Sequence, residues 1–452
     1  MAQVVPFRGW RYSPQQVGNL ARVVAPPYDV IGEAQREALV SGHPNSIVRL
    51  TLGVDPLGTP PTRSRYELAA ADLREWRRQG VLVQDEDPVF YLYEQQYRPP
   101  TPLESVTADI KHRRGVIGLV KLQEYHEGVV LPHEGTLKAP KADRRRLLEA
   151  AQCAFSQVFG IYSDSELTLE GLAQGVCASD PLVEVEDAEQ VIHRMWLMPS
   201  GECAAVSRML AHRPIVIADG HHRYETALAY RGERREEHGV VDDAPWEYVS
   251  MYLCNTEADQ LTILPSHRLI RHLPLEAEAQ LWRSVMEVFE TERVAIDTSC
   301  DRARAEGIHN LLHEMSSSQA GEHTFALYAG GNYALLLRLR DMNSAARHGL
   351  SALPDAVRAL DVAILHKLVI EGIMGLEGEM AATGVNILFS REGHQAADRV
   401  ARGEAAMVLL VNTTRVDQVM QVALAGEHMP QKGTHFYPKT LAGLVLHDLR
   451  PE

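Results

Sequence analysis

Cysteine is scarce in this 452-residue chain, which has five of them, widely spaced and without a Cys-x-x-Cys pair. Zinc knuckles and dithiol redox sites need closely spaced thiols, so neither is expected. A sparse, odd count is typical of reduced thiols in a cytoplasmic protein. The first residues lack the apolar core of a signal peptide, and no window approaches roughly 18 apolar residues. We therefore expect a cytoplasmic protein with no membrane partner.

An excess of positive charge is also lacking, because 45 Lys and Arg face 60 Asp and Glu, a net charge of −15. Proteins that bind nucleic acid without specificity present a basic face, so we expect no nucleic-acid partner. A locally basic pocket could still bind a small anion.

The chain is too long for one ordinary core, and its hydrophobic fraction of 45% is that of a globular protein. Two or three domains are therefore expected.

The stretch 213–227 organises the chain. Its residues 215–218 form a short apolar run rich in β-branched side chains, which predicts a buried strand. An Asp-Gly pair breaks this run, and a helical pattern continues to about Glu237. Five polar or flexible residues consequently lie at a strand-to-helix turn: Asp219, Gly220, His221, His222 and Arg223.

Such a turn is suited to binding an anion, because free backbone amides and the helix dipole point outward there. Gly220 would let the backbone approach a ligand, and Arg223 could form two parallel hydrogen bonds to a phosphate or carboxylate. Asp219 suits a general base or a metal ligand. A strand–Asp-Gly–helix junction is also common as plain structure, with Asp as a helix cap. Several consecutive polar residues of the kinds found in active sites follow the buried strand here, and this favours a functional site over a purely structural junction.

Two further stretches carry chemistry. Residues 127–146 crowd His133, Glu134, Thr136 and Lys138 into a loop, which indicates a site unless it is simply a solvated charged loop. The metalloprotease pattern of two His four residues apart is absent from it.

Residues 429–440 hold Lys432 and Thr434 on either side of a glycine, and could contact an anion or form an exposed terminal loop. The spacing of a Walker A loop is absent.

The N-terminal region adds a stiff loop. Two prolines precede Tyr28 and Asp29 and fix the backbone that presents them. A helix is predicted from residue 32, with Glu33 in its first turn. Residues 45–52 are predicted to form a strand.

The predicted fold is of the mixed α/β, or α+β, class. A core domain over 1–272 would carry the Asp-Gly-His-His-Arg turn and the His-Glu-Gly-Thr loop. An α+β lobe would follow over 273–345, and a C-terminal α/β segment over 346–452 would contribute the Gln-Lys-Gly-Thr loop to the site.

Four segments together resemble the bacterial and archaeal family catalogued as domain of unknown function 1015: 24–31, 129–136, 217–227 and 429–439. The Asp-Gly-His-His-Arg turn is also similar to the signature of the ParB/sulfiredoxin-like nucleotide-binding fold. The same motif resembles that of free serine kinases, which phosphorylate L-serine with ADP or ATP. The resemblance therefore implies a ParB/sulfiredoxin-like core with a second α/β lobe.

The resemblance also implies an activity, namely phosphoryl transfer from ATP or ADP with Mg²⁺ to a small molecule, with free L-serine as the best candidate. The phosphates would lie on the turn 220–223, with Lys432 and Thr434, and an upstream acid would take the hydroxyl proton. Glu33, Glu134 and Asp219 are the candidate catalytic acids, with Asp219 also the candidate metal ligand. Residues for the small-molecule substrate would be Tyr28, Asp29, His133, Thr136 and Lys138.

Two other functions stay open on the residues alone. One is a ParB-like switch or scaffold that binds a nucleotide without acting on a metabolite. The other is a metal-dependent phosphatase that uses Asp219 and His221. A homodimer is compatible with the sequence.

Overall fold

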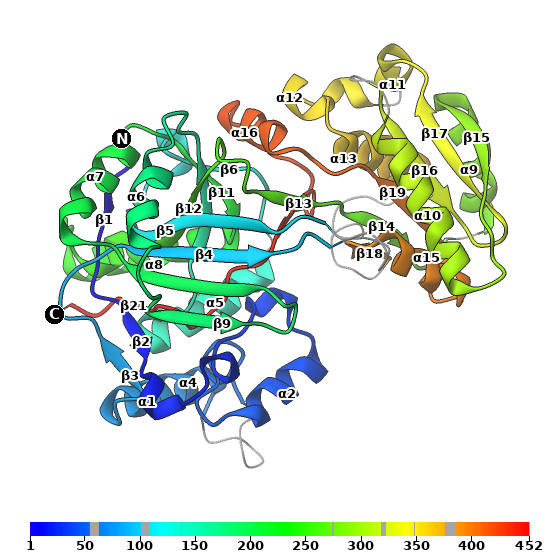
Figure 1. The fold of residues 1–452 in the computed structure, drawn as a ribbon. Coiled ribbons are helices and arrows are strands. Elements are labelled where there is room, and N and C mark those ends of the chain that lie inside the picture. The colour runs from blue at the N-terminus through cyan, green and yellow to red at the C-terminus, as the bar shows by residue number, and fades with distance from the viewer. Residues whose placement is uncertain are drawn as a thin grey trace.

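Two β-sheets, each in its own lobe, dominate the computed structural model (Figure 1). The structure describes residues 1–54, 63–100, 108–136, 138–273, 275–317, 322–347, 349–375 and 386–451. Strands and helices alternate through both lobes, which confirms the mixed α/β class. Within these ranges, none of the helices combines the length and apolar character needed to cross a bilayer.

The large lobe is built on a nine-stranded sheet in which antiparallel pairs predominate. Only β6–β11 and β8–β12 are parallel among the pairs of described strands. The path through the sheet, with β1 (Val4–Val5) attached to β5, is β6 (Val130–Pro132), β11 (Ile215–Asp219), β8 (Val158–Tyr162), β12 (Tyr248–Asn255), β5 (Lys111–Lys121), β4 (Tyr91–Tyr97), β10 (Ile192–Leu197) and β9 (Val183–Glu186).

Strand β11 is buried on both faces, which explains why its sequence is apolar without alternation. Ile215 and Ile217 face a core shared with helices α6 (Thr168–Val176) and α7 (Ser200–Ala211). Val216 and Ala218 face the opposite core. A strand buried on both faces needs apolar residues at every position, so the prediction of a buried strand here is confirmed.

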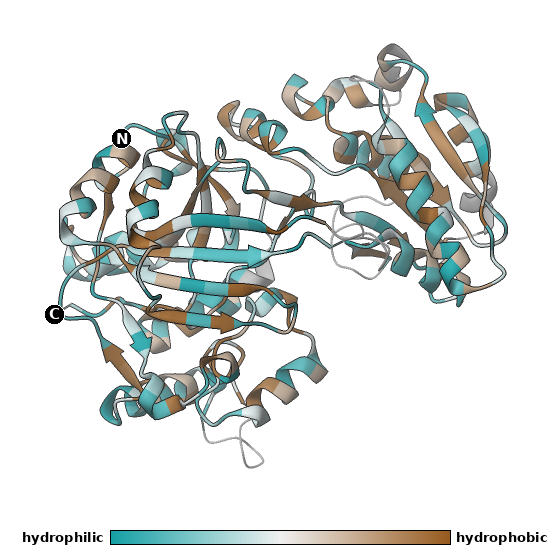
Figure 2. Ribbon diagram, in the orientation of Figure 1, coloured by the Kyte–Doolittle hydropathy of each residue, from teal (hydrophilic) through white to brown (hydrophobic). Residues whose placement is uncertain are grey.

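Three helices of the large lobe pack side by side: α4 (Arg65–Arg78), α5 (Lys138–Ala151) and α8 (His221–His238). Helix α4 begins with a capping box, in which Ser64 and Glu67 each accept a hydrogen bond from the other's backbone amide. It buries the face that carries Leu73 and Trp76. In Figure 2 the strands of the small lobe are mostly apolar, β4 and β5 of the large lobe carry long hydrophilic stretches, and the outer faces of many helices are hydrophilic.

One local prediction is wrong. Residues 45–52 do not form a strand, because Val48–Thr51 is the short helix α3. Its β-branched residues suggested a strand, yet Ile47, Val48 and Leu50 are all fully buried. The helix lies beside α2 (Glu33–Gly42) and α4, so tertiary packing overrides local β-propensity.

The small lobe contains a six-stranded antiparallel sheet covered by α10 (Asp301–Ser316) and α15 (Gly393–Ala401). Its strands follow the order β15 (Phe289–Ala295), β17 (Tyr333–Leu339), β16 (Thr324–Tyr328), β19 (Met407–Val411), β14 (His267–Ile270) and β18 (Ile387–Ser390). This sheet thus takes strands from all three of the predicted segments 1–272, 273–345 and 346–452.

After helix α16 (Val416–Leu424) the chain returns to the large lobe (Figure 1). Residues 429–440 are called the strap below. Its strand β20 (His435–Tyr437) pairs with β13 (Thr262–Leu264). Farther on, β21 (His447–Asp448) pairs with β7 (Cys153–Ala154). The strap therefore lies against the large lobe although it follows the small lobe in sequence.

A buried arginine fixes the strap to the large sheet. The Arg113 side chain is fully buried in β5 and donates hydrogen bonds to the backbone carbonyls of Tyr437, at 3.2 Å, and Pro438. It also donates to Gln95 Oε1, and Gln95 Nε2 donates to the carbonyl of Lys439 at 2.9 Å. Three consecutive strap carbonyls are thus paired with two side chains of the sheet.

We expect Arg113→Met to lower the free energy of unfolding by about 2–4 kcal/mol, because buried carbonyls would lose their donors. The matched control is Arg338→Met, which removes an arginine that pairs with Glu292 and Glu314 on the small-lobe surface. Exposed ion pairs contribute less than about 1 kcal/mol. Urea unfolding of both variants measures the difference, and equal losses would contradict the role of Arg113.

Candidate functional site

The predicted strand–turn–helix is present. Strand β11 ends at Asp219, and helix α8 begins at His221. Gly220 between them has φ of 92°, and a Cβ there would lie 2.9 Å from the Arg223 guanidinium. Only glycine fits both demands. The first amides of α8 therefore point outward from the end of a buried strand, as anion sites at helix starts require.

The Asp219 carboxylate lies between two cations. One oxygen accepts a hydrogen bond from Arg223 Nη2 at 2.6 Å, and the other accepts one from Lys439 Nζ. Burial alone would raise the pKa of Asp219, but the charges of Lys439 and Arg223 outweigh it and hold the pKa well below its usual range. Asp219 is consequently ionised near neutrality and is a poor proton acceptor.

Lys439 is a site residue that sequence analysis missed. It lies in the strap, 220 positions from Asp219. The only signal was its place at the end of the 429–439 motif, where no local pattern distinguishes it from a surface lysine. The structure shows that the lysine completes the ion pair at the turn.

The second and third predicted stretches meet each other. Glu134 accepts hydrogen bonds from the amides of Lys432 and Thr434, both at 3.2 Å. The amide of Met429 donates to the carbonyl of His133 at 2.8 Å. The Thr434 hydroxyl is 2.9 Å from His133 Nε2. The two loops are thus joined, and much of their polar chemistry is used between them.

Two histidines behind the turn are held uncharged. The rings of His133 and His221 are 4.7 Å apart, and burial lowers the pKa of both. His133 Nδ1 donates to the carbonyl of Ile217 at 2.6 Å. His221 Nε2 accepts from the amide of His133 at 3.3 Å. This pair fixes the His-Glu loop to the end of β11.

These segments enclose one pocket at the start of α8. It is lined by Tyr28, Asp29, Glu134, Gly135, Asp219, Gly220, His221, His222, Arg223, Gln431 and Lys432. Three predicted stretches and the proline-rich N-terminal loop therefore converge, although they are far apart in sequence. Tyr28 is held in the wall by Arg144, whose guanidinium lies 4.1 Å from the ring centroid.

Glu33 and Thr136 are not among the residues that line this pocket. Glu33 is the first residue of α2, and its largely exposed side chain pairs with Arg36. The Thr136 hydroxyl donates to Glu225 on α8 at 2.7 Å, which fixes the loop to the helix. Lys138 begins α5, but its side chain lies outside the described residues.

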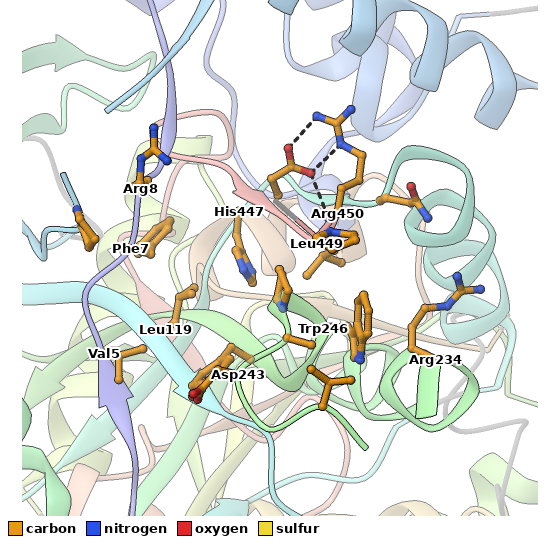
Figure 3. A pocket seen from close by; sticks show the side chains of 18 of the residues that line it. Val5, Phe7, Arg8, Leu119, Arg234, Asp243, Trp246, His447, Leu449 and Arg450 are labelled. Atoms are coloured by element: carbon orange, nitrogen blue, oxygen red, sulfur yellow. Dashed lines mark hydrogen bonds and ion pairs between the residues drawn. The ribbon is translucent and has the colours of Figure 1, made fainter. Parts of the chain in front are cut away.

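A wider cleft lies elsewhere in the large lobe (Figure 3). It has a volume of about 1300 Å³ and lies between the N-terminal segment, the loop before β12 and the C-terminal segment. Phe7, Trp246 and His447 are among its labelled walls. It is lined by none of the predicted site residues, so size alone does not identify the site.

Comparisons with known proteins give a family and remote structural likenesses. A family model described as "Protein of unknown function (DUF1015)" matches residues 4–363. The curated proteins contain no match.

Three of the solved structures found illustrate how remote the likeness is. A free serine kinase in complex with AMP is 12% identical with a TM-score of 0.33, over 68% of this chain and 83% of that one. C-terminally truncated SbnI from Staphylococcus aureus is 9% identical with a TM-score of 0.35, over 72% and 85%. A conserved hypothetical protein from Pyrococcus furiosus is 11% identical with a TM-score of 0.32, over 68% and 86%. At these scores the likeness carries no functional argument.

The buried histidines predict a loss of stability in mild acid. Because burial lowers the folded-state pKa of His221 below the unfolded value of about 6.5, the unfolded chain takes up protons first as the pH falls. Stability is therefore complete above pH ~6.5 and declines below it, by about 1.4 kcal/mol per pH unit for each such histidine. Urea unfolding between pH 7.5 and 5 measures the slope.

The variant His221→Gln should reduce this slope by about 1.4 kcal/mol per pH unit. His238 lies on the same helix and is half exposed, so His238→Gln serves as the control and should leave the slope unchanged. An unaltered slope in His221→Gln would contradict the neutral, buried state of this histidine.

Proposed function

The chain belongs to the DUF1015 family, whose description names no function, and we propose that it moves a phosphoryl group from ATP or ADP to a small-molecule hydroxyl. Free L-serine is the best candidate acceptor. One observation carries the proposal: segments 28–29, 134–135, 219–223 and 431–432 meet at one pocket on the start of α8. The similarity of the Asp-Gly-His-His-Arg turn to that of free serine kinases supports the choice of donor and acceptor.

The phosphates would lie against the first amides of α8. Arg223 is already oriented by Asp219, by Ser156 Oγ at 3.2 Å and by the carbonyl of Gln157. Lys432 is exposed at the pocket wall, and among the described residues no carboxylate pairs with its side chain. Preoriented cations and amides of this kind stabilise charge on a transferring phosphoryl group.

The three predicted acids differ in what they can do. Asp219 is ionised and engaged by two cations, so we assign it to orienting Arg223 and Lys439. Glu33 is not among the residues that line the pocket. Glu134 lies on the wall and is held there by the backbone amides of Lys432 and Thr434 and not by a cation, and we assign it the task of accepting the acceptor's hydroxyl proton. Tyr28 and Asp29, on the opposite loop, would contact the acceptor.

A nucleotide donor would bring Mg²⁺, and the fit of the carboxylates can be tested on their contacts. Asp219 does not fit, because both its oxygens are engaged by cations. Asp29 fits, since it lines the pocket and its carboxylate accepts no hydrogen bond within the described part of the chain. Among those residues no group of three His, Cys, Asp or Glu is placed to hold a metal. Mg²⁺ needs only one or two carboxylates besides phosphates and water, and when bound it neutralises phosphate charge.

The test is phosphorus NMR of the protein with Mg²⁺, ATP, ADP or pyrophosphate, and L-serine. We expect a new phosphomonoester resonance that appears only with serine. L-Alanine is the matched control, because it has the same backbone groups without the hydroxyl. Slow loss of nucleotide without an acceptor product would favour a nucleotide-binding switch. No change with any donor would contradict the transferase.

We expect Asp219→Asn to lower kcat/KM by about 100-fold, because Arg223 and Lys439 would lose the charge that orients them. The matched control is Asp398→Asn, which removes a carboxylate that pairs with Arg304 in the small lobe. That variant should leave the activity unchanged. Thermal unfolding of both variants separates lost activity from lost folding, and wild-type turnover in Asp219→Asn would overturn the assignment.

A further inference from the structure

The wide cleft of the large lobe (Figure 3) lies on the side of the molecule away from the small lobe. Strands β1 and β21 contribute to its walls, and Figure 1 shows both at that end of the large lobe. Its volume of about 1300 Å³ exceeds the roughly 300–1000 Å³ of sites that bind small molecules. The cleft therefore suits a segment of a protein better than a metabolite.

The composition of the walls is that of a protein interface. Two of the chain's five tryptophans, Trp10 and Trp246, line the cleft, as do Phe7, Tyr230 and Tyr248. Of the described residues that line it, none is Lys or Glu. Aromatic residues and Arg are enriched in protein–protein interfaces, whereas Lys and Glu are depleted there. The cleft therefore has the character of a surface that another protein chain covers.

The charges at the cleft allow two copies of an acidic protein to meet there. A net charge of −15 opposes association of two copies through an average part of their surface. The cleft, however, is lined by three arginines and by only two acids: Arg8, Arg234, Arg450, Asp243 and Asp448. Two copies can therefore approach each other through this face with little repulsion.

An exposed apolar tip stands beside the cleft. It is formed by Val240 and Val241, in the loop that follows α8, and is called the valine tip below. Val240 is 68% exposed, the highest value among the described large apolar side chains after Met1. Val241 is also exposed and lines the cleft. Single exposed apolar residues are common, but here an apolar projection and an apolar recess occur together on one face of the molecule.

The valine tip is held in place by the residues that follow and precede it. The amide of Ala244 donates a hydrogen bond to the carbonyl of Val241 at 3.1 Å. The rings of His238 and Trp246, which lie on either side of the loop in sequence, stack with their centroids 5.5 Å apart. A loop that is already oriented loses little conformational entropy on binding. The valine tip can therefore enter an apolar recess without refolding.

We propose that the cleft is occupied by a second copy of this chain, in a two-fold dimer in which the valine tip of each copy enters the cleft of the other. Because tip and cleft lie on one face, the same contact forms twice about a single axis, and the assembly closes at two copies. Asp242, which follows the tip, is exposed and pairs with no cation in the described part of the chain. In the dimer it faces the partner's Arg8 and Arg450, which line the cleft (Figure 3). The inference is independent of the proposed transferase function.

Analytical ultracentrifugation of the full chain over a concentration series tests the dimer. We expect the mass of the wild type to rise with concentration from 50.3 kDa to twice that value. Val240→Glu places a charge in both halves of the interface and should raise the dissociation constant of the dimer at least about ten-fold. Because Val240 is exposed in a loop, the variant should fold as the wild type does.

Leu424→Glu is the matched control, because it makes the same kind of change at a side chain that is 55% exposed at the end of α16. It should leave the dissociation constant unchanged. A wild type that stays monomeric at every concentration would overturn the proposal and leave the cleft to a different occupant. A dimer that Val240→Glu does not weaken, or that Leu424→Glu weakens equally, would also overturn it, because association would then use another surface.

Hydrogen exchange at low and high protein concentration tests the reciprocal arrangement. Each copy contributes both a tip and a cleft, so dimerisation should slow amide exchange in the loop 239–243 and in the cleft residues 449–451 together. Slower exchange in the loop alone would overturn the two-fold arrangement. Unchanged exchange in both segments, in a protein that dimerises, would overturn the assignment of the interface to this face.

Discussion

The ionised carboxylate of Asp219, held between Arg223 and Lys439, joins three parts of the molecule that are distant in sequence. It ends the central strand β11, orients the first turn of α8 and binds the strap that returns from the small lobe. A buried charge is tolerated only where its partners are in place. The geometry of the turn therefore depends on the position of the strap, and the strap in turn is fixed by Arg113 and Gln95.

This dependence gives the small lobe a role in the site although it contributes no wall residue that the sequence predicted. The strap reaches the large lobe only after the chain has built the six-stranded sheet and α16. Lys432 and Lys439 arrive on it together, one at the pocket wall and the other on Asp219. Three cations, Arg223, Lys432 and Lys439, are thus brought together with the three carboxylates Asp29, Glu134 and Asp219 in a chain whose net charge is −15.

Much of the pocket wall could be predicted from sequence because its residues lie in short, local sequence patterns. The apolar run 215–218, the Asp-Gly break and the helical period fixed the turn, and the proline-rich loop marked Tyr28 and Asp29. What failed depended on distant contacts. Lys439 pairs across 220 positions, and the short helix α3 is helical because of its neighbours. Glu33 is in the predicted first turn of a helix, where its exposed side chain pairs with Arg36, and its catalytic role stays a prediction.

The contacts at the turn also separate roles that residue types alone leave open. A carboxylate beside a predicted phosphate site could be a base, a metal ligand or an organiser of cations. Two engaged oxygens and a lowered pKa leave Asp219 the third role. By the same reasoning, Thr434 and His133 are engaged with each other and position the loop, whereas Asp29 and Lys432 keep their charged groups open to a ligand. In the proposed function, proton acceptance, cation binding and phosphate binding would be distributed over Glu134, Asp29 and the start of α8, as phosphoryl transfer requires.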